Sequence, residues 1–130
     1  MQFAIRYQHE LHKDTLKPGD VLVSNHPEAG GTHLPDITVI TPVFHKGEIV
    51  FYVASRGHHS DIGGAGITAM SPNTKELWQE GVSIKSFKLV SEGNFNEEGI
   101  VKLFNQVAEM PGCSATRNIS HNLNDLRAQV

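Results

Sequence analysis

Residues 37–55 decide the fold, and they read ITVITPVFHKGEIVFYVAS. Two runs rich in Val, Ile, Thr, Phe and Tyr, residues 37–44 and 49–55, are typical of β-strands. Between them stands His-Lys-Gly-Glu (45–48), a short polar stretch whose glycine is typical of a tight turn. The sequence therefore predicts a β-hairpin, with one segment leading into it and another leading out.

Chemically reactive side chains stand at both ends of this hairpin. Residues 30–36 read GGTHLPD, and residues 56–64 read RGHHSDIGG. Because the advances of two antiparallel strands cancel, the segment before the first strand and the segment after the second should be neighbours. We expect the imidazoles and carboxylates of both segments to share a few ångströms of space. These side chains belong to His33, Asp36, His58, His59 and Asp61.

This set of side chains predicts a metal site. Two imidazoles and one carboxylate with open positions form an arrangement that binds Zn, Mn or Fe. An open position would let the ion activate water or polarise a carbonyl group. The alternative is that His33 and Asp36 are solvated loop groups, which is the commoner fate of such a pair. Four further histidines stand in polar stretches and are expected at the solvated surface: His9, His12, His45 and His121.

Composition limits the classes of protein to consider. A chain of 130 residues with 38% hydrophobic content is sufficient for one domain with a core. A net charge of −3 gives no reason to expect nucleic acid as a partner. No apolar run is long enough to predict a membrane span. Cys113 is the lone cysteine, which favours a reducing compartment such as the cytoplasm, and we expect a passive thiol there.

The pattern along the chain predicts an α+β fold. Antiparallel strands are expected, with the hairpin flanked by Gly-rich loops and with C-terminal helices packed on one face. Further strands are predicted at residues 20–25 and 84–90, whereas residues 1–13 show no clean period and are interpreted as a helix end or a short strand. Because the pattern is cut off at both ends, we expect residues 1–130 to be a partial domain of a longer protein.

Two helices are expected towards the C-terminus. Asn94, with Glu97 three residues later, is interpreted as the cap of the first helix. Its apolar stripe, which we expect to be buried, consists of Ile100, Leu103, Phe104 and Val107. The second helix begins at about Ser120. Its apolar face consists of Leu123, Leu126 and Val130.

Residues 63–66 read GGAG and admit two interpretations. Their backbone N–H groups could bind an anion, but no Lys-Ser or Lys-Thr follows and no strand-to-helix GxGxxG pattern surrounds them, so we predict no nucleotide site. We expect instead a flexible active-site loop in which Gly63 and Gly64 let a substrate approach the backbone. Arg56 could hold a substrate carboxylate with two hydrogen bonds. For Arg56 and Arg117, an ordinary ion pair with Asp or Glu is an equal alternative.

Six segments stand out when the chain is read as a whole. They are GDVLVSNHP (19–27), GGTHLPD (30–36), TPVF (41–44), SRGHHSDIGG (55–64), EG (80–81) and NLNDLRAQ (122–129). Together they resemble the hydantoinase B/oxoprolinase family. Within it, SNHP (24–27), YVASR (52–56) and CSATRN (113–118) are most similar to the ATP-dependent 5-oxoprolinases of eukaryotic type. Residues 63–72 keep the length of a family loop but lack its Pro-Gly turn and one proline of a pair.

The resemblance implies part of an enzyme. B components of the family are several-fold longer than this chain, and they act with an ATP-binding A component on a separate subunit or in the same polypeptide. The implied reaction is the ATP-coupled opening of 5-oxo-L-proline to L-glutamate, a step of glutathione metabolism, or the opening of a related cyclic amide such as a hydantoin. ATP with Mg would bind outside this chain, and the full protein is expected to be a homo-oligomer.

The resemblance also implies site residues. The family pattern of a His-x-x-Asp pair and a later histidine corresponds to His33, Asp36 and His58, the trio that the hairpin argument also selects. We predict His59 and Asp61 as catalytic groups beside the metal. The rival interpretation is a non-catalytic fragment or pseudoenzyme that serves as an assembly module.

Overall fold

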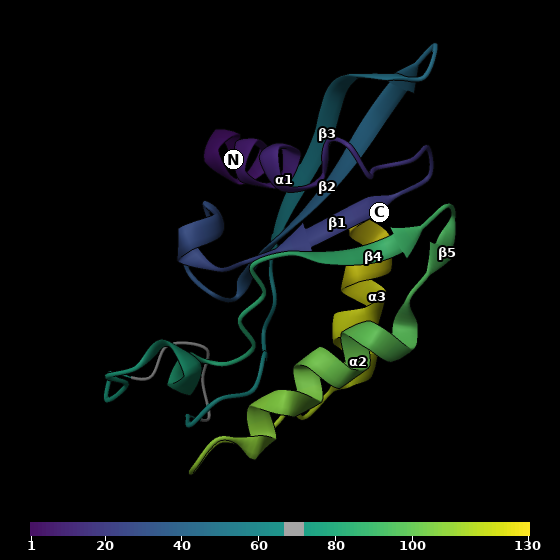
Figure 1. The fold of residues 1–130 in the computed structure, drawn as a ribbon. Helices are drawn as coiled ribbons and strands as arrows, with labels where there is room; N and C mark the ends of the chain where they lie inside the picture. The colour runs from purple at the N-terminus through teal and green to yellow at the C-terminus, as the bar shows by residue number, and fades with distance from the viewer. Residues whose placement is uncertain (67–71) are drawn as a thin grey trace.

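The computed structural model describes residues 1–66 and 72–130 and confirms an α+β fold (Figure 1). Five strands form one antiparallel sheet in the order β3-β2-β1-β4-β5. The strands are β1 (Val21–Ser24), β2 (Asp36–His45), β3 (Glu48–His58), β4 (Phe87–Ser91) and β5 (Asn94–Phe95). The helices are α1 (Gln2–His12), α2 (Glu97–Gln106) and α3 (Ile119–Gln129), with short 3₁₀ helices η1 (Pro27–Ala29), η2 (Leu77–Glu80) and η3 (Val107–Glu109). Among the described residues, no helix has the length and apolar character that a membrane span requires.

Strands β2 and β3 form the predicted hairpin, and their pairing is longer than the sequence indicated. Cα partners run from His45 and Glu48 at the turn to Asp36 and His58 at the open end. The turn residues 46–47 have φ angles of 50° and 84°, which is the left-handed pair that a two-residue hairpin turn requires. The first residue of β2 and the last residue of β3, both predicted site residues, therefore lie directly opposite each other.

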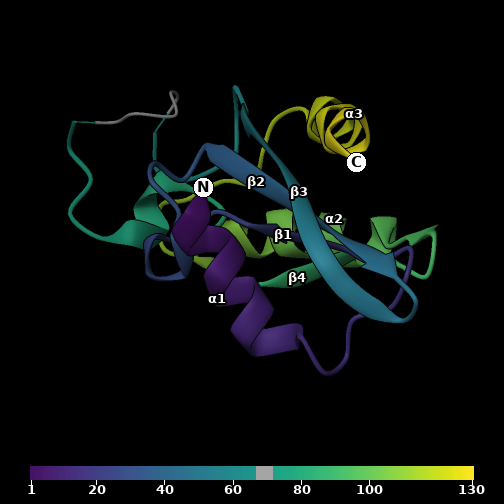
Figure 2. The same cartoon turned by 90° about the horizontal axis from the view of Figure 1, so that it is seen from above.

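The sheet is covered on both faces, so the molecule has three layers (Figures 1 and 2). Helix α1 lies on one face, where Ala4 and Leu16 pack with Leu22 and Ile40 of the sheet in a small core. Helices α2 and α3 lie together on the other face, as predicted, over a larger core. Its fully buried members include Val23, Ile37, Leu89, Ile100, Phe104 and Leu126.

The start of α2 differs from the prediction. Asn94 lies in β5 and pairs with Ser91 of β4, because residues 92–93 turn the chain back with φ angles of 47° and 87°. The helix cap is Asn96, whose side-chain oxygen accepts the backbone N–H of Gly99 at 3.0 Å. The assignment of the cap to Asn94 is therefore wrong by two residues, since the chain is still extended there.

The N-terminal segment 1–13 forms a helix on the sheet rather than a short strand. His9 and His12 of this helix are half-buried and lie within hydrogen-bond distance of other parts of the chain. The expectation that they lie at the solvated surface is therefore wrong. His9 Nδ1 lies 2.8 Å from the Tyr52 hydroxyl of β3, and His12 Nε2 lies 2.7 Å from Ser86 Oγ. The other two are exposed, as expected: His45 and His121.

The strand expected at 84–90 begins only at Phe87. Ile84 does not join the ladder because its N–H donates to the Asn25 side chain at 2.7 Å and its C=O accepts the Asn25 N–H at 2.9 Å. At the C-terminus, α3 ends at Gln129 and leaves Val130 exposed, so Val130 does not continue the buried face of the helix.

Candidate functional site

Three of the predicted site residues converge at the open end of the hairpin. His58 Nδ1 lies 2.8 Å from Asp36 Oδ1 across the β2–β3 pair. His33 joins them from the loop before β2, with its ring centroid 5.8 Å from that of His58. One potential ligand atom from each residue lies within 4.8 Å of the others. The predicted convergence of His33, Asp36 and His58, called the trio below, is therefore present.

The loop that carries His33 is fixed by backbone and side-chain hydrogen bonds. The His33 C=O accepts the Asp36 N–H at 2.8 Å, and the Pro35 C=O accepts the His59 N–H at 2.8 Å. Asn25, which is fully buried, donates from Nδ2 to the Leu34 C=O at 2.7 Å. Sequence reasoning missed this role of Asn25, although a polar residue ending an apolar run is the signal that could have found it.

Electrostatics keep the Asp36 carboxylate ionised. The hydrogen bond from His58 is the main cause that holds the pKa of Asp36 below its ordinary value; burial opposes this effect, and the hydroxyl of Thr32 adds to it. His58 is exposed and Asp36 is half-buried, so solutes can reach the trio from one side. Two imidazoles and an ionised carboxylate are a donor set that suits borderline divalent cations.

His59 is adjacent to the trio in sequence but makes its side-chain hydrogen bonds with α3. Its side chain is fully buried against α3, where Nε2 lies 3.1 Å from Gln129 Oε1 and Nδ1 lies 3.2 Å from Asn122 Nδ2. Burial lowers the pKa of His59 below the ordinary imidazole value. The structure thus connects His59 to α3, and the catalytic role predicted for it stays a prediction.

Asp61 makes its side-chain hydrogen bonds with groups outside the trio. Its Oδ2 accepts Nε of Arg117 at 2.8 Å, and its Oδ1 accepts the N–H of Gly63 at 2.9 Å. Burial raises the pKa of Asp61, but Arg117 and the backbone N–H groups outweigh it and leave the pKa below its ordinary value. The ion-pair interpretation is therefore correct for Arg117, and the catalytic role predicted for Asp61 stays a prediction.

Arg56 uses its guanidinium within the chain. Nε donates to Thr38 Oγ1 at 2.7 Å, Nη2 donates to the Gly30 C=O at 3.2 Å, and Nη1 lies 3.5 Å from Thr32 Oγ1. Thr32 Oγ1 in turn donates to Asp36 Oδ2 at 3.2 Å. Arg56 therefore lies beside the site that the sequence predicted for it, while its contact with a substrate stays a prediction.

The glycines of residues 63–66 pack against other backbone segments. Gly64 N–H donates to the Ser114 C=O at 2.9 Å, and Ala65 N–H donates to the Gln79 C=O at 2.8 Å. A Cβ on Gly63 or Gly64 would lie 2.6 Å from a carbonyl oxygen. These two amides donate within the chain, and the expectation that this segment binds no nucleotide stays a prediction. The rest of the predicted flexible loop, residues 67–71, lies outside the described residues.

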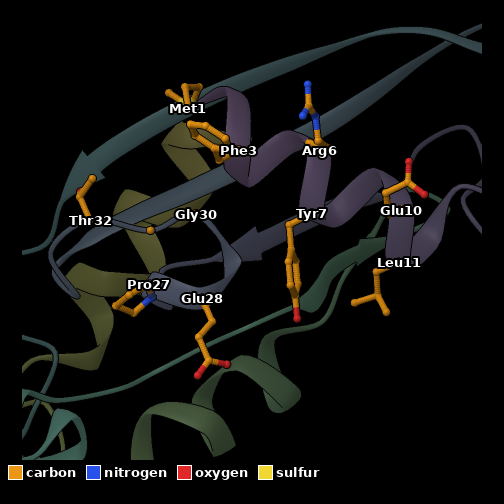
Figure 3. A pocket seen from close by; sticks show the side chains of 11 residues that line it. Met1, Phe3, Arg6, Tyr7, Glu10, Leu11, Pro27, Glu28, Gly30 and Thr32 are labelled. Carbon is orange, nitrogen blue, oxygen red and sulfur yellow. The ribbon is translucent and has the colours of Figure 1, made fainter.

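A groove of about 880 Å³ lies between α1 and residues 27–32 (Figure 3). Its α1 wall is largely apolar, and Phe3 and Leu11 are 72% and 55% exposed. Thr32 lines this groove and also donates to Asp36. The groove is thus adjacent to the trio, although none of the three trio residues lines it.

Comparison with known proteins gives a consistent result. The family model for hydantoinase B/oxoprolinase matches residues 1–130. The chain is 62% identical over 130 residues to 5-oxoprolinase PfmaA of Pestalotiopsis fici and 55% identical over 132 residues to the 5-oxoprolinase of Saccharomyces cerevisiae. All of this chain is matched in both cases, but it spans only 10% of the length of either relative.

A solved structure shares the fold. The crystal structure of the ATP-dependent caprolactamase from Pseudomonas jessenii superposes with a TM-score of 0.82 at 32% sequence identity. The match covers 97% of this chain and 20% of that chain.

Proposed function

The chain belongs to the hydantoinase B/oxoprolinase family, and we propose that it is part of an ATP-dependent amidohydrolase that opens 5-oxo-L-proline to L-glutamate. A related cyclic amide such as a hydantoin is the alternative substrate. The relatives named 5-oxoprolinase, at 62% and 55% identity, support this reaction class. The observation in the structure that carries the proposal is the convergence of two imidazoles and a carboxylate within 4.8 Å.

The trio fits a divalent cation, and we propose that His33, Asp36 and His58 hold Zn, Mn or Fe. When bound, such an ion supplies Lewis acidity that can polarise a carbonyl group or a water molecule. The chain contributes the arrangement of donors. The hydrogen-bond register of the hairpin sets Asp36 opposite His58, and the Asn25 contact fixes the loop that carries His33.

A division of labour explains the dependence on ATP. The ring amide is stabilised by resonance, so water attacks it slowly. Transfer of the terminal phosphoryl group of ATP to the carbonyl oxygen of the lactam would release ADP and leave an electrophilic carbon. Attack by water would then break the C–N bond, with the ring nitrogen leaving as the amine, and give an acyl phosphate. A second water would hydrolyse this acyl phosphate to L-glutamate and inorganic phosphate. Because the amides of Gly64 and Ala65 are used within the chain, we propose that ATP with Mg binds to a hydantoinase A-type domain or subunit outside these residues. The whole protein would be a cytoplasmic homo-oligomer acting in glutathione metabolism.

The test is His58→Ala in the complete protein, with His121→Ala, an exposed histidine on α3, as the matched control. We expect His58→Ala to abolish release of glutamate from 5-oxoproline because one of the three donors is lost. ATP affinity should stay close to that of the unchanged protein. Both quantities are measured side by side, by amino-acid analysis and by equilibrium nucleotide binding.

Two outcomes would contradict the proposal. If His58→Ala released glutamate at the normal rate, the trio would not be required for the reaction. An equal loss of ATP affinity would mean that this segment lines the nucleotide site.

A second candidate function is a non-catalytic assembly module, and the exposed apolar side chains of Phe3 and Leu11 favour it. This candidate predicts that His58→Ala changes neither glutamate release nor nucleotide binding. Substitution of Phe3 by a polar residue would instead reduce the yield of the assembled protein, as measured by size-exclusion chromatography.

A further inference from the structure

A line of polar side chains runs from β3 to the carboxylate of the trio. Arg56 Nη1 lies 3.5 Å from Thr32 Oγ1, and Thr32 Oγ1 lies 3.2 Å from Asp36 Oδ2. The other oxygen of Asp36, Oδ1, lies 2.8 Å from His58 Nδ1. The two oxygens of Asp36 therefore have different partners, one on the arginine side and one on the histidine side.

The direction of these hydrogen bonds is fixed by the chemistry of the groups. A guanidinium can only donate, and an ionised carboxylate can only accept. The single hydroxyl proton of Thr32 must therefore go to Asp36, while the Thr32 oxygen accepts from Arg56. Arg56 is itself restrained, because Nε donates to Thr38 Oγ1 at 2.7 Å and Nη2 donates to the Gly30 C=O at 3.2 Å.

From this arrangement we infer that Thr32 is a positioning residue that orients the Asp36 carboxylate for cation binding, an inference that rests on the metal site proposed above. The Thr32 hydroxyl donates to Oδ2, and Oδ1 is the oxygen that contacts the imidazole of His58. Without the hydroxyl, the carboxylate loses its partner on the arginine side and can rotate about its Cβ–Cγ bond. Partners of this kind that hold a metal-binding side chain commonly affect metal affinity although they do not touch the ion.

The experiment measures Co²⁺ binding to the metal-stripped complete protein by its visible absorption. Thr32→Val replaces the hydroxyl with a methyl group of similar size, and we expect it to weaken Co²⁺ binding by about 10- to 100-fold. Thr41→Val is the control, because Thr41 is a half-buried threonine of β2 opposite Val53, away from the trio. Its Co²⁺ affinity should equal that of the unchanged protein.

A second pair of variants separates the hydroxyl from the bulk of the side chain. Thr32→Ser and Thr32→Ala both lack the methyl group and differ only in the hydroxyl. We expect Co²⁺ affinity close to normal for Thr32→Ser and weakened for Thr32→Ala. The thermal midpoints of the metal-free variants should be similar, since Thr32 is exposed, and this readout excludes a general loss of structure.

The outcomes distinguish failure of the role of Thr32 from failure of the proposed metal site. If His33→Ala abolishes Co²⁺ binding but Thr32→Val and Thr32→Ala bind normally, the metal site stands and the role of Thr32 is wrong. If the unchanged protein binds no Co²⁺, both the metal site and the positioning role are wrong. Weak binding by Thr32→Ala together with near-normal binding by Thr32→Ser supports the inference.

Discussion

His58 and His59 are neighbours in the chain with opposite environments. His58 is exposed beside Asp36, whereas His59 is only 1% exposed and faces α3. Asn122 Nδ2 can only donate, so His59 Nδ1 must accept from it, and His59 Nε2–H then donates to Gln129 Oε1. Only the neutral imidazole satisfies both contacts, which agrees with the lowered pKa of His59.

This buried imidazole predicts a dependence of stability on pH. In the unfolded chain His59 titrates near pH 6.5, while burial lowers its pKa in the folded protein. Below about pH 6.5 the unfolded state therefore binds more protons, and the free energy of unfolding falls by up to about 1.4 kcal/mol per pH unit until the folded pKa is reached. Above that window the contribution is fully present.

The measurement is urea unfolding at pH 7.5 and pH 5.5 for the unchanged protein and for His59→Gln, which has no titrating group. We expect a smaller loss of stability in His59→Gln. His58 and Asp125, which influence His59 electrostatically, are present in both proteins, so they do not account for a difference between them. An equal loss in both proteins would show that His59 titrates normally in the folded state.

Among the elements, the start of α2 shows how a turn displaces a cap. The β4–β5 hairpin keeps Asn94 extended, and the helix begins only after Asn96. Asn96 then satisfies the N–H of Gly99, one of the four N–H groups that lack partners at a helix start. The two asparagines form a natural pair for testing the cap, because both are exposed.

We expect Asn96→Ala to lower the free energy of unfolding by about 1 kcal/mol, which is typical for loss of an N-cap side chain. Asn94→Ala should cost clearly less, since the side chain of Asn94 accepts no helix N–H. Denaturant unfolding of both variants compares the two values. If Asn94→Ala lost more free energy of unfolding than Asn96→Ala, Asn94 would be the helix cap, as the sequence predicted.

Across the whole molecule, the trio exists only in the folded chain. His33 precedes the hairpin and His58 ends it, so an unfolded chain does not hold their imidazoles together. A ligand that binds only the folded state stabilises it by mass action. Zinc at roughly 100 times its dissociation constant should therefore raise the free energy of unfolding by about 2.7 kcal/mol.

Thermal and denaturant unfolding with and without zinc test this expectation. His33→Ala should remove the stabilisation. His45→Ala, which changes an exposed histidine at the hairpin turn, should retain it. If zinc stabilised His33→Ala as much as the unchanged protein, zinc would bind at a site other than the trio.

Much of the architecture and the position of the trio could be predicted from sequence, because both follow from short-range rules. Alternating β-branched and aromatic residues on each side of a glycine turn specify the hairpin, and the advances of its two strands nearly cancel. Residue 36 lies opposite residue 58 because the register shifts by one residue between Val43 and Phe44. The stripe that includes Ile100 and Phe104 specified the buried face of α2. In each case, the pattern of residues a few positions apart was sufficient to predict the element.

Tertiary structure decided which groups these side chains meet. Three hydrogen-bonded pairs join residues that are far apart in the chain. They are Gln129 with His59, Ser114 with Gly64, and Ile84 with Asn25. Such partners depend on how helices and loops pack on the two faces of the sheet, and no local periodicity encodes that packing. For this reason the sequence located the trio, while only the packed chain showed that His59 bonds to α3 and that Asp61 pairs with Arg117.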